Sequence, residues 1–216
     1  MNPLTMIIGF IPQVVFAVLV NWLSLGWAAA ISLAVAAVLI GYTAARGGVK
    51  VLPVVQAVIL AVFTVIGFAA SHHAATSVAP YARGATSLAV GAFILATSRA
   101  YPFTAQFARR GVPRQYWHSP QFLAVNRRIS LAWGLAVLAV GAAHLAAAFI
   151  GGAPVIRIAL DWAVPVFAAS RAIAVTRRAI AASARSPQPG SPAAGAPVAA
   201  APQAGDLDAP AAPTAG

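Results

Sequence analysis

Long apolar runs separated by short polar segments fill most of this chain. A helix that crosses a membrane needs roughly 20 mostly apolar residues, because a rise of about 1.5 Å per residue must cover about 30 Å of hydrocarbon. Six runs meet or approach this length, and they cover residues 6–23, 27–43, 51–71, 82–98, 129–150 and 155–175. The pattern therefore predicts an all-α fold, a polytopic transmembrane helical bundle with six spans.

The span count depends on the first, second and fourth runs. One continuous helix over 6–43 would be about 57 Å long, nearly twice the hydrocarbon thickness. We therefore expect a tight hairpin at residues 21–26. The fourth run, 82–98, is the shortest.

The long polar segment at residues 99–128 connects the fourth and fifth runs. It carries six of the fourteen basic residues, interleaved with aromatic side chains, a composition typical of a membrane–water interface. Its prolines interrupt any single long helix. We therefore predict short interfacial helices near 103–110 and 120–128, the second running into the fifth span. The candidates for contact with lipid or a partner are Arg109, Arg110, Arg114, Trp117, Asn126, Arg127 and Arg128.

The composition changes at residue 186, where Ala, Pro, Gly and Ser become dominant and aromatic residues disappear. Such a segment cannot bury enough apolar surface to offset its ordering entropy. We predict a transmembrane domain over 1–185 and a disordered tail over 186–216.

The basic residues are distributed unevenly between the two predicted sides. With six spans, eleven lie on the side that receives both termini, whereas Arg83 and Arg157 lie on the other. The positive-inside rule places the basic side in the cytoplasm. Since the first basic residue is Arg46, the charged region of a signal peptide is missing, and we expect the first run to be retained as a span.

The overall composition excludes a water-soluble globule. Apolar residues make up 61% of the chain and charged residues 8%, with a mean hydropathy of +0.84, whereas soluble domains average about 25% charged residues. The formal charge is +11, but the arginines stand between apolar runs. We therefore expect anionic lipid headgroups as partners and no nucleic acid. The absence of cysteine removes disulfide and thiolate chemistry.

Short motifs within the apolar runs resemble one protein family. Residues 10–16 read FIPQVVF, similar to an early Phe-Leu-Pro-x-Val-x-Phe pattern. The fifth run matches the spacing of an Ala-Trp…Gly-x-Ala-Asn…Ala-Phe helix. The matching residues are Ala132, Trp133, Gly141, Ala143, His144, Ala148 and Phe149. His144 occupies the position of the asparagine in that pattern, where this family often has an amide side chain. Residues 161–165, DWAVP, are similar to an Asn-Trp-x-x-Pro motif in the last helix of a subgroup of the same family. Residues 117–130 also resemble the corresponding segment of that subgroup.

By these motifs the chain resembles the intracellular septation protein A family, small bacterial inner-membrane proteins linked to envelope synthesis and division. The resemblance implies a non-enzymatic role in envelope maintenance or septation, exerted through helix and cytoplasmic-loop contacts with envelope or division membrane proteins. It implies five spans as the alternative to the six counted from the apolar runs, and no catalytic residues. The resemblance does not decide whether the chain forms a homo-oligomer.

Polar side chains inside the apolar runs favour an alternative, a small-solute or ion transporter with a polar interior site. These residues are Gln13, Gln56, His144, Arg157 and Asp161. Intramembrane ionisable groups are costly and often functional, but buried amides also join helices, at about 0.6 kcal/mol each. Arg157 and Asp161 are one helical turn apart, so we expect them to pair structurally. A transporter requires Gln13, Gln56, His144 and Asp161 to line one cavity.

Enzyme signatures are missing from the sequence: there is no Walker loop, nucleophile elbow, HExxH helix or paired-carboxylate site. We therefore expect no enzymatic activity, no catalytic residues, no cofactor and no metal. The weakest alternative is a metal or haem site that joins His144 to His72 and His73, because these few histidines form a thin ligand set.

Overall fold

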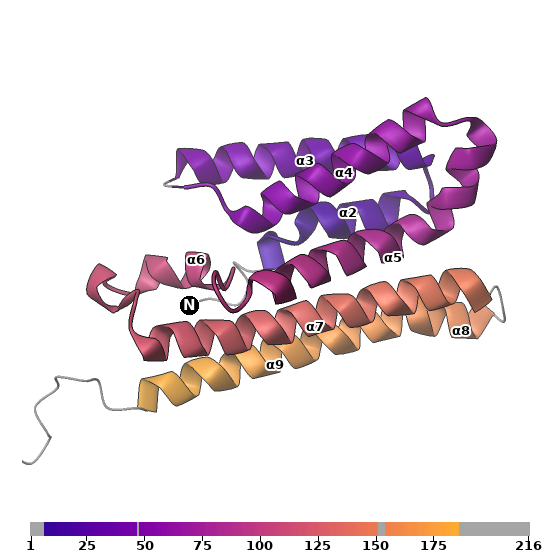
Figure 1. Ribbon diagram of the computed structural model, residues 1–216. Helices are drawn as coiled ribbons and strands as arrows, with labels where there is room; N and C mark the ends of the chain where they lie inside the picture. The colour runs from indigo at the N-terminus through magenta and orange to yellow at the C-terminus, as the bar shows by residue number, and fades with distance from the viewer. Residues whose placement is uncertain (1–6, 47, 151–153, 186–216) are drawn as a thin grey trace, which may run out of the picture. The chain divides into compact units, whose positions relative to one another are not determined.

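The structure, a computed structural model, describes residues 7–46, 48–150 and 154–185. Within these ranges all regular structure is helical (Figure 1), which confirms the predicted all-α class. The predicted tail at 186–216 lies outside the described residues.

Five helical segments in the described chain are long and apolar enough to cross a membrane. Four of them are α3 (Leu25–Ala45), α4 (Val51–Ala69), α5 (His72–Thr97) and α7 (Pro120–Ile150). The fifth combines α8 (Pro154–Ile158), the π-helical turn η3 (Ala159–Ala163) and most of α9 (Val164–Arg185). Successive helices run in alternating directions (Figure 1). This is the architecture of a multi-pass membrane protein.

The first apolar run forms a shorter helix than predicted. Helix α2 (Ile11–Leu19) has nine residues, about half of what a span needs. Pro12 fits its first turn because that position needs no amide hydrogen. At the other end, Asn21 Nδ2 donates to the carbonyl oxygens of Ala17 (2.7 Å) and Val18 (3.1 Å), which ends the helix. The chain then turns into α3, as the predicted hairpin requires.

Helix α5, which contains the fourth apolar run, starts earlier than predicted, at His72 rather than at residue 82. Ser71 caps it, since its hydroxyl oxygen accepts from the Ala74 amide at 3.3 Å. Pro80 lies inside the helix, where its ring removes one backbone hydrogen bond and bends the axis. Figure 1 shows the first turns of α5 running at a steep angle to the rest.

Helices α5 and α7 pack closely because small residues line their contact. A Cβ atom added to Gly91 would lie 2.9 Å from the Leu138 backbone nitrogen, and one added to Gly141 would lie 2.8 Å from the Leu88 nitrogen. Such positions allow close approach of helices without bulky side chains between them. On its other side, α7 packs against α9, where Trp133 Nε1 donates to Thr176 Oγ1 at 3.1 Å.

The 99–128 segment folds back over one end of the bundle. It contains α6 (Ala105–Ala108) and the 3-10 turns η1 (Arg109–Gly111) and η2 (Arg114–Tyr116), before α7 begins at Pro120. Lys50 Nζ donates to the Gln106 carbonyl at 2.8 Å, and Gln106 Oε1 accepts from the Val51 amide at 3.0 Å. The two basic connections therefore lie together at the same end.

Candidate functional site

The most unusual backbone of the described chain surrounds Asp161. This residue lies in η3, where the Val164 amide donates to the Ala159 carbonyl, five residues back. Pro165 contributes to this geometry because it has no amide hydrogen to donate to the Asp161 carbonyl, its partner in a regular α-helix. Single π-helical turns are rare and frequently occur at functional sites.

Asp161 is paired with Arg83, across the bundle on α5. Arg83 Nη2 lies 3.2 Å from each carboxylate oxygen of Asp161, and the two side chains are 13% and 12% exposed. Burial strengthens the attraction of the two charges but also raises the cost of leaving either one alone. The pair therefore fixes the position of η3 against α5.

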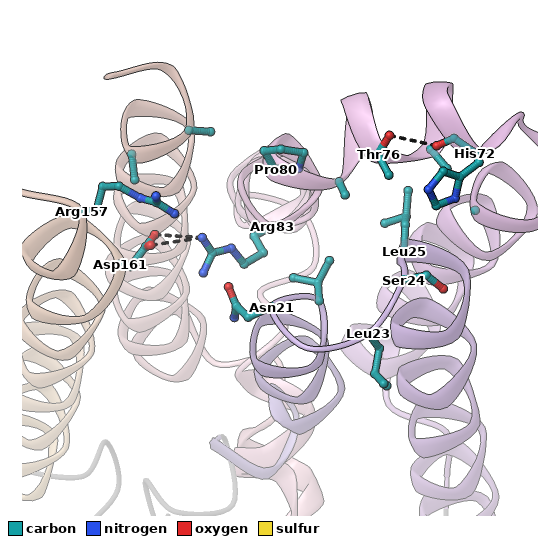
Figure 2. A pocket seen from close by; sticks show the side chains of 16 residues that line it. Asn21, Leu23, Ser24, Leu25, His72, Thr76, Pro80, Arg83, Arg157 and Asp161 are labelled. Atoms are coloured by element: carbon teal, nitrogen blue, oxygen red, sulfur yellow. Dashed lines mark hydrogen bonds and ion pairs between the residues drawn. The ribbon is translucent and has the colours of Figure 1, made fainter. Parts of the chain in front are cut away.

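The predicted partner of Asp161 was wrong. Within the described residues Asp161 forms its ion pair with Arg83, and Arg157 has an exposed side chain without an ion pair. The physical reason is the π-helical turn, which widens the spacing per turn so that residues four apart no longer stack on one face. Figure 2 shows the Arg157 guanidinium beside the Arg83–Asp161 pair, at the edge of a cavity.

This outer cavity has a volume of about 410 Å³ and lies at the end of the bundle opposite the 99–128 segment. Its wall carries Asn21 from the hairpin, His72 and Thr76 from the first turns of α5, and the charged groups of Arg83, Arg157 and Asp161 (Figure 2). The cavity is therefore rich in polar and cationic groups.

An inner cavity of about 290 Å³ lies deeper, between α2, α5, α7 and α9. Its wall is mostly apolar and includes the polar side chains of Gln13, Ser87 and His144. Gln13 Nε2 donates to Ser87 Oγ at 2.7 Å. Gln13 Oε1 and His144 Nδ1 have no hydrogen-bond partner within the described residues, although the two side chains are only 9% and 5% exposed. Buried polar atoms without partners are costly, so they indicate a site that a ligand or water completes.

The two cavities share Arg83 and Asp161 in their walls. The ion pair therefore stands where a polar space at the end of the bundle meets an apolar space inside it. Chemically, the arrangement suits binding of a ligand that has both a charged and an apolar part.

Three of the four residues expected for a transporter come together here. Gln13, His144 and Asp161 all line the inner cavity. Gln56 does not, so the expectation that all four line one cavity was wrong. Gln56 is fully buried elsewhere, with its Nε2 donating to the Gly9 carbonyl at 3.1 Å and its Oε1 also without a partner within the described residues. Its role is to join α4 to the start of the first apolar run.

Sequence reasoning missed Arg83 and Ser87. A signal for Arg83 was available, because Asp161 is the one acidic residue before position 186 and a carboxylate in an apolar run needs a cation. Local spacing favoured Arg157 over an arginine 78 positions away. Ser87 carries no comparable signal, since serine is common on packed helices.

The contact candidates of the 99–128 segment have different surroundings. The guanidinium carbons of Arg109 and Arg114 lie 5.1 and 5.7 Å from the centre of the half-buried Trp117 ring, within cation–π range. Trp117 Nε1 donates to the Val112 carbonyl at 2.8 Å. Arg127 donates to the Arg99 carbonyl at 2.7 Å. The arginines at 127 and 128 are exposed, and the side chain of Arg110 lies outside the described residues.

Asn126 is not a surface residue, contrary to its proposed role in lipid or partner contact. Its side chain is 2% exposed, its Nδ2 donates to the Phe122 carbonyl at 2.8 Å, and its Oδ1 accepts from Thr104 Oγ1 at 3.1 Å. Thr104 also lies 3.0 Å from Ser130 Oγ. This polar cluster anchors the segment to α7, which explains an amide within an arginine-rich stretch.

The histidines considered for metal binding do not gather. His72 and His73 are exposed at the start of α5, whereas His144 is buried in α7. Within the described residues no group of three His, Cys, Asp or Glu side chains lies close enough to hold a metal ion. Their arrangement gives the metal alternative no support.

Comparison of the chain with protein-family models, with curated proteins and with solved structures found no match.

Proposed function

We propose that this protein is a membrane transporter-type protein that binds a ligand at the Arg83–Asp161 centre. The observation that carries the proposal is the convergence of Gln13, His144 and Asp161, from three separate helical elements, on one cavity. Polar groups at membrane depth are costly and are retained mainly where they line a cavity or pair with one another. Here they do both.

The backbone near the centre supports the same function. Helices that are interrupted beside a polar site are a recurrent feature of transporters, because the interruption frees backbone groups and permits local movement. Helix α5 bends at Pro80, three residues before Arg83, and η3 interrupts the last membrane-spanning segment at Asp161. Both interruptions lie beside the ion pair.

Thiol labelling tests this proposal directly, because the chain has no cysteine of its own. We expect Ser87→Cys, in the wall of the inner cavity, to react with a small maleimide in phosphatidylcholine vesicles. The matched control is Val62→Cys. Val62 lies on α4 and is 53% exposed, on the outside of the helical bundle. Val62→Cys should react far more slowly, because a thiol in hydrocarbon has no water to stabilise its reactive thiolate. An unreactive Ser87→Cys in folded protein would contradict a ligand-accessible centre.

We propose as a second function a non-enzymatic role in envelope maintenance or septation, in a bacterial inner membrane with both termini cytoplasmic. This orientation requires the first apolar run to cross the membrane in addition to the five long segments. The resemblance to the septation family supports it, together with the cationic and aromatic surface formed by Arg109, Arg114 and Trp117. Guanidinium groups around an aromatic ring suit contact with anionic lipid headgroups or with a membrane-protein partner.

In vivo crosslinking tests the second proposal. A photoreactive residue in place of Gln115, exposed between Arg114 and Trp117, should capture the same division or envelope protein reproducibly. The matched control is a photoreactive residue at Leu135, exposed on α7 within the predicted membrane region. Capture of lipid alone from both positions would contradict a protein partner. A reporter fused after residue 185 that is active in the periplasm would overturn the orientation.

A further inference from the structure

We propose that the ligand of the Arg83–Asp161 centre is a lipid with an anionic phosphate headgroup, which enters sideways from the bilayer. This inference rests on the proposed transporter-type function and names the ligand class of that site. The headgroup occupies the outer cavity and a hydrocarbon chain occupies the inner cavity.

The inner cavity opens toward the hydrocarbon region. Four of the side chains in its wall are also exposed: Val14 and Trp162 at 59% each, Val18 at 40% and Ile7 at 37%. They come from α2, from the residues just before it and from η3, so the opening lies between the first apolar run and η3. Helix α2 packs mainly against α3, whereas α9 packs mainly against α7, which leaves the opening uncovered within the described chain. In a bilayer, such an opening faces lipid chains.

The outer cavity carries excess positive charge. Arg83 and Arg157 lie in its wall with a single carboxylate, that of Asp161. Because Arg83 is bound to Asp161 and Arg157 has no ion pair within the described residues, Arg157 is the cation available to a new anion. The Arg157 guanidinium lies beside the pair (Figure 2). A planar guanidinium can donate two parallel hydrogen bonds to phosphate oxygens, which makes arginine a preferred phosphate ligand.

The order of the two cavities matches the orientation of a membrane lipid. From the end of the bundle inward, the walls change from polar and cationic, through the ion pair, to apolar. A phospholipid in one leaflet presents its phosphate at the interface and its chains toward the bilayer centre. A free phosphate ion would leave the inner cavity unused, and a neutral apolar molecule would leave Arg157 unused. An anionic lipid uses both.

Quenching of Trp133 fluorescence by brominated lipid chains tests this proposal. Trp133 lines the inner cavity and is 5% exposed, so a lipid chain reaches its ring only from within that cavity. A variant in which the other four tryptophans are phenylalanine isolates its signal. In phosphatidylcholine vesicles, we expect brominated phosphatidylglycerol to quench Trp133 with saturation at a low fraction of total lipid. Brominated phosphatidylcholine has the same phosphate but also a choline cation, which the excess positive charge of the outer cavity repels, so it should require a fraction about tenfold higher.

Two controls separate a bound lipid from bulk lipid. A variant that retains only Trp27, which is 60% exposed on α3, should be quenched in proportion to brominated lipid without headgroup preference. Arg157→Gln should reduce the preference for phosphatidylglycerol about tenfold, since it removes the excess cation that disfavours the choline group. Arg171→Gln, at an exposed arginine of α9 outside both cavities, should leave the preference unchanged.

The outcomes also distinguish this inference from the proposed function. If Trp133 is not quenched, or is quenched equally by both headgroups, the anionic-lipid inference is overturned. Reactivity of Ser87→Cys in the same vesicles would then still support a ligand-accessible centre. If Ser87→Cys is unreactive and Trp133 is unquenched, both proposals fail together.

Discussion

Asp161 is the one acidic residue that the structure describes, and its carboxylate needs a cation because it lies within an apolar segment. Arg83 supplies that cation, and both side chains are nearly enclosed. Removal of either partner leaves the other charge buried without compensation, whereas removal of both leaves two neutral groups. The energetics of the pair are therefore measurable with a double-mutant cycle.

We expect Arg83→Gln to lower the free energy of unfolding by about 3 kcal/mol, since it strands the Asp161 carboxylate. Asp161→Asn should cost a similar amount, and the double variant should recover much of the loss. Unfolding of purified protein in detergent, followed by circular dichroism, measures these differences. The matched control is Arg157→Gln, for which we expect less than about 0.5 kcal/mol because the side chain is exposed. An equal loss in Arg83→Gln and Arg157→Gln would contradict the observed pairing.

At the scale of the helices, hydropathy predicted where the apolar runs lie, but local contacts decide where each helix ends. Residues 72–81 look too polar for a span, yet the Ser71 cap and several alanines extend α5 through them. In the first run, Asn21 ends α2 after nine residues. Neither boundary follows from mean hydropathy, because caps act through single hydrogen bonds.

The crossing of α3 and α4 depends on two glycines in backbone contact. A Cβ atom added to Gly67 would overlap the Gly26 backbone, and backbone atoms cannot move aside as a flexible side chain can. We expect Gly67→Ala to separate the helices and to lower the free energy of unfolding by about 1–3 kcal/mol. Thermal unfolding in detergent measures the loss.

Gly41 provides the matched control for this prediction, because it lies in α3 and an added Cβ would meet no atom within 4 Å. Gly41→Ala should be neutral or stabilising by up to about 1 kcal/mol, since alanine loses less backbone entropy than glycine in a helix. Equal effects of Gly67→Ala and Gly41→Ala would contradict the close crossing.

At the scale of the whole described chain, the fold class and the grouping of basic connections follow from sequence, whereas the site does not. Apolar runs predict helices because length and hydropathy are local properties. The Arg83–Asp161 pair joins positions 78 residues apart, and the inner cavity draws its wall from five elements, α2, α5, α7, η3 and α9. Such contacts depend on which helix faces pack together. Gln13, His144 and Asp161 were identified as polar exceptions, but their convergence required the packed bundle.

The ion pair lines both cavities, so a path from one to the other would run past it, and its removal should widen that path. We expect Asp161→Asn to raise the rate at which Ser87→Cys reacts with a membrane-impermeant maleimide, added in phosphatidylcholine vesicles from the side of the outer cavity. Because about 1.4 kcal/mol corresponds to a factor of ten, a pair of that strength predicts about a tenfold increase. Thr76→Cys lies in the wall of the outer cavity itself and should react at the same rate with or without Asp161→Asn. A Ser87→Cys rate that does not change, in protein that remains folded, would mean that the pair supports the bundle without closing a path through it.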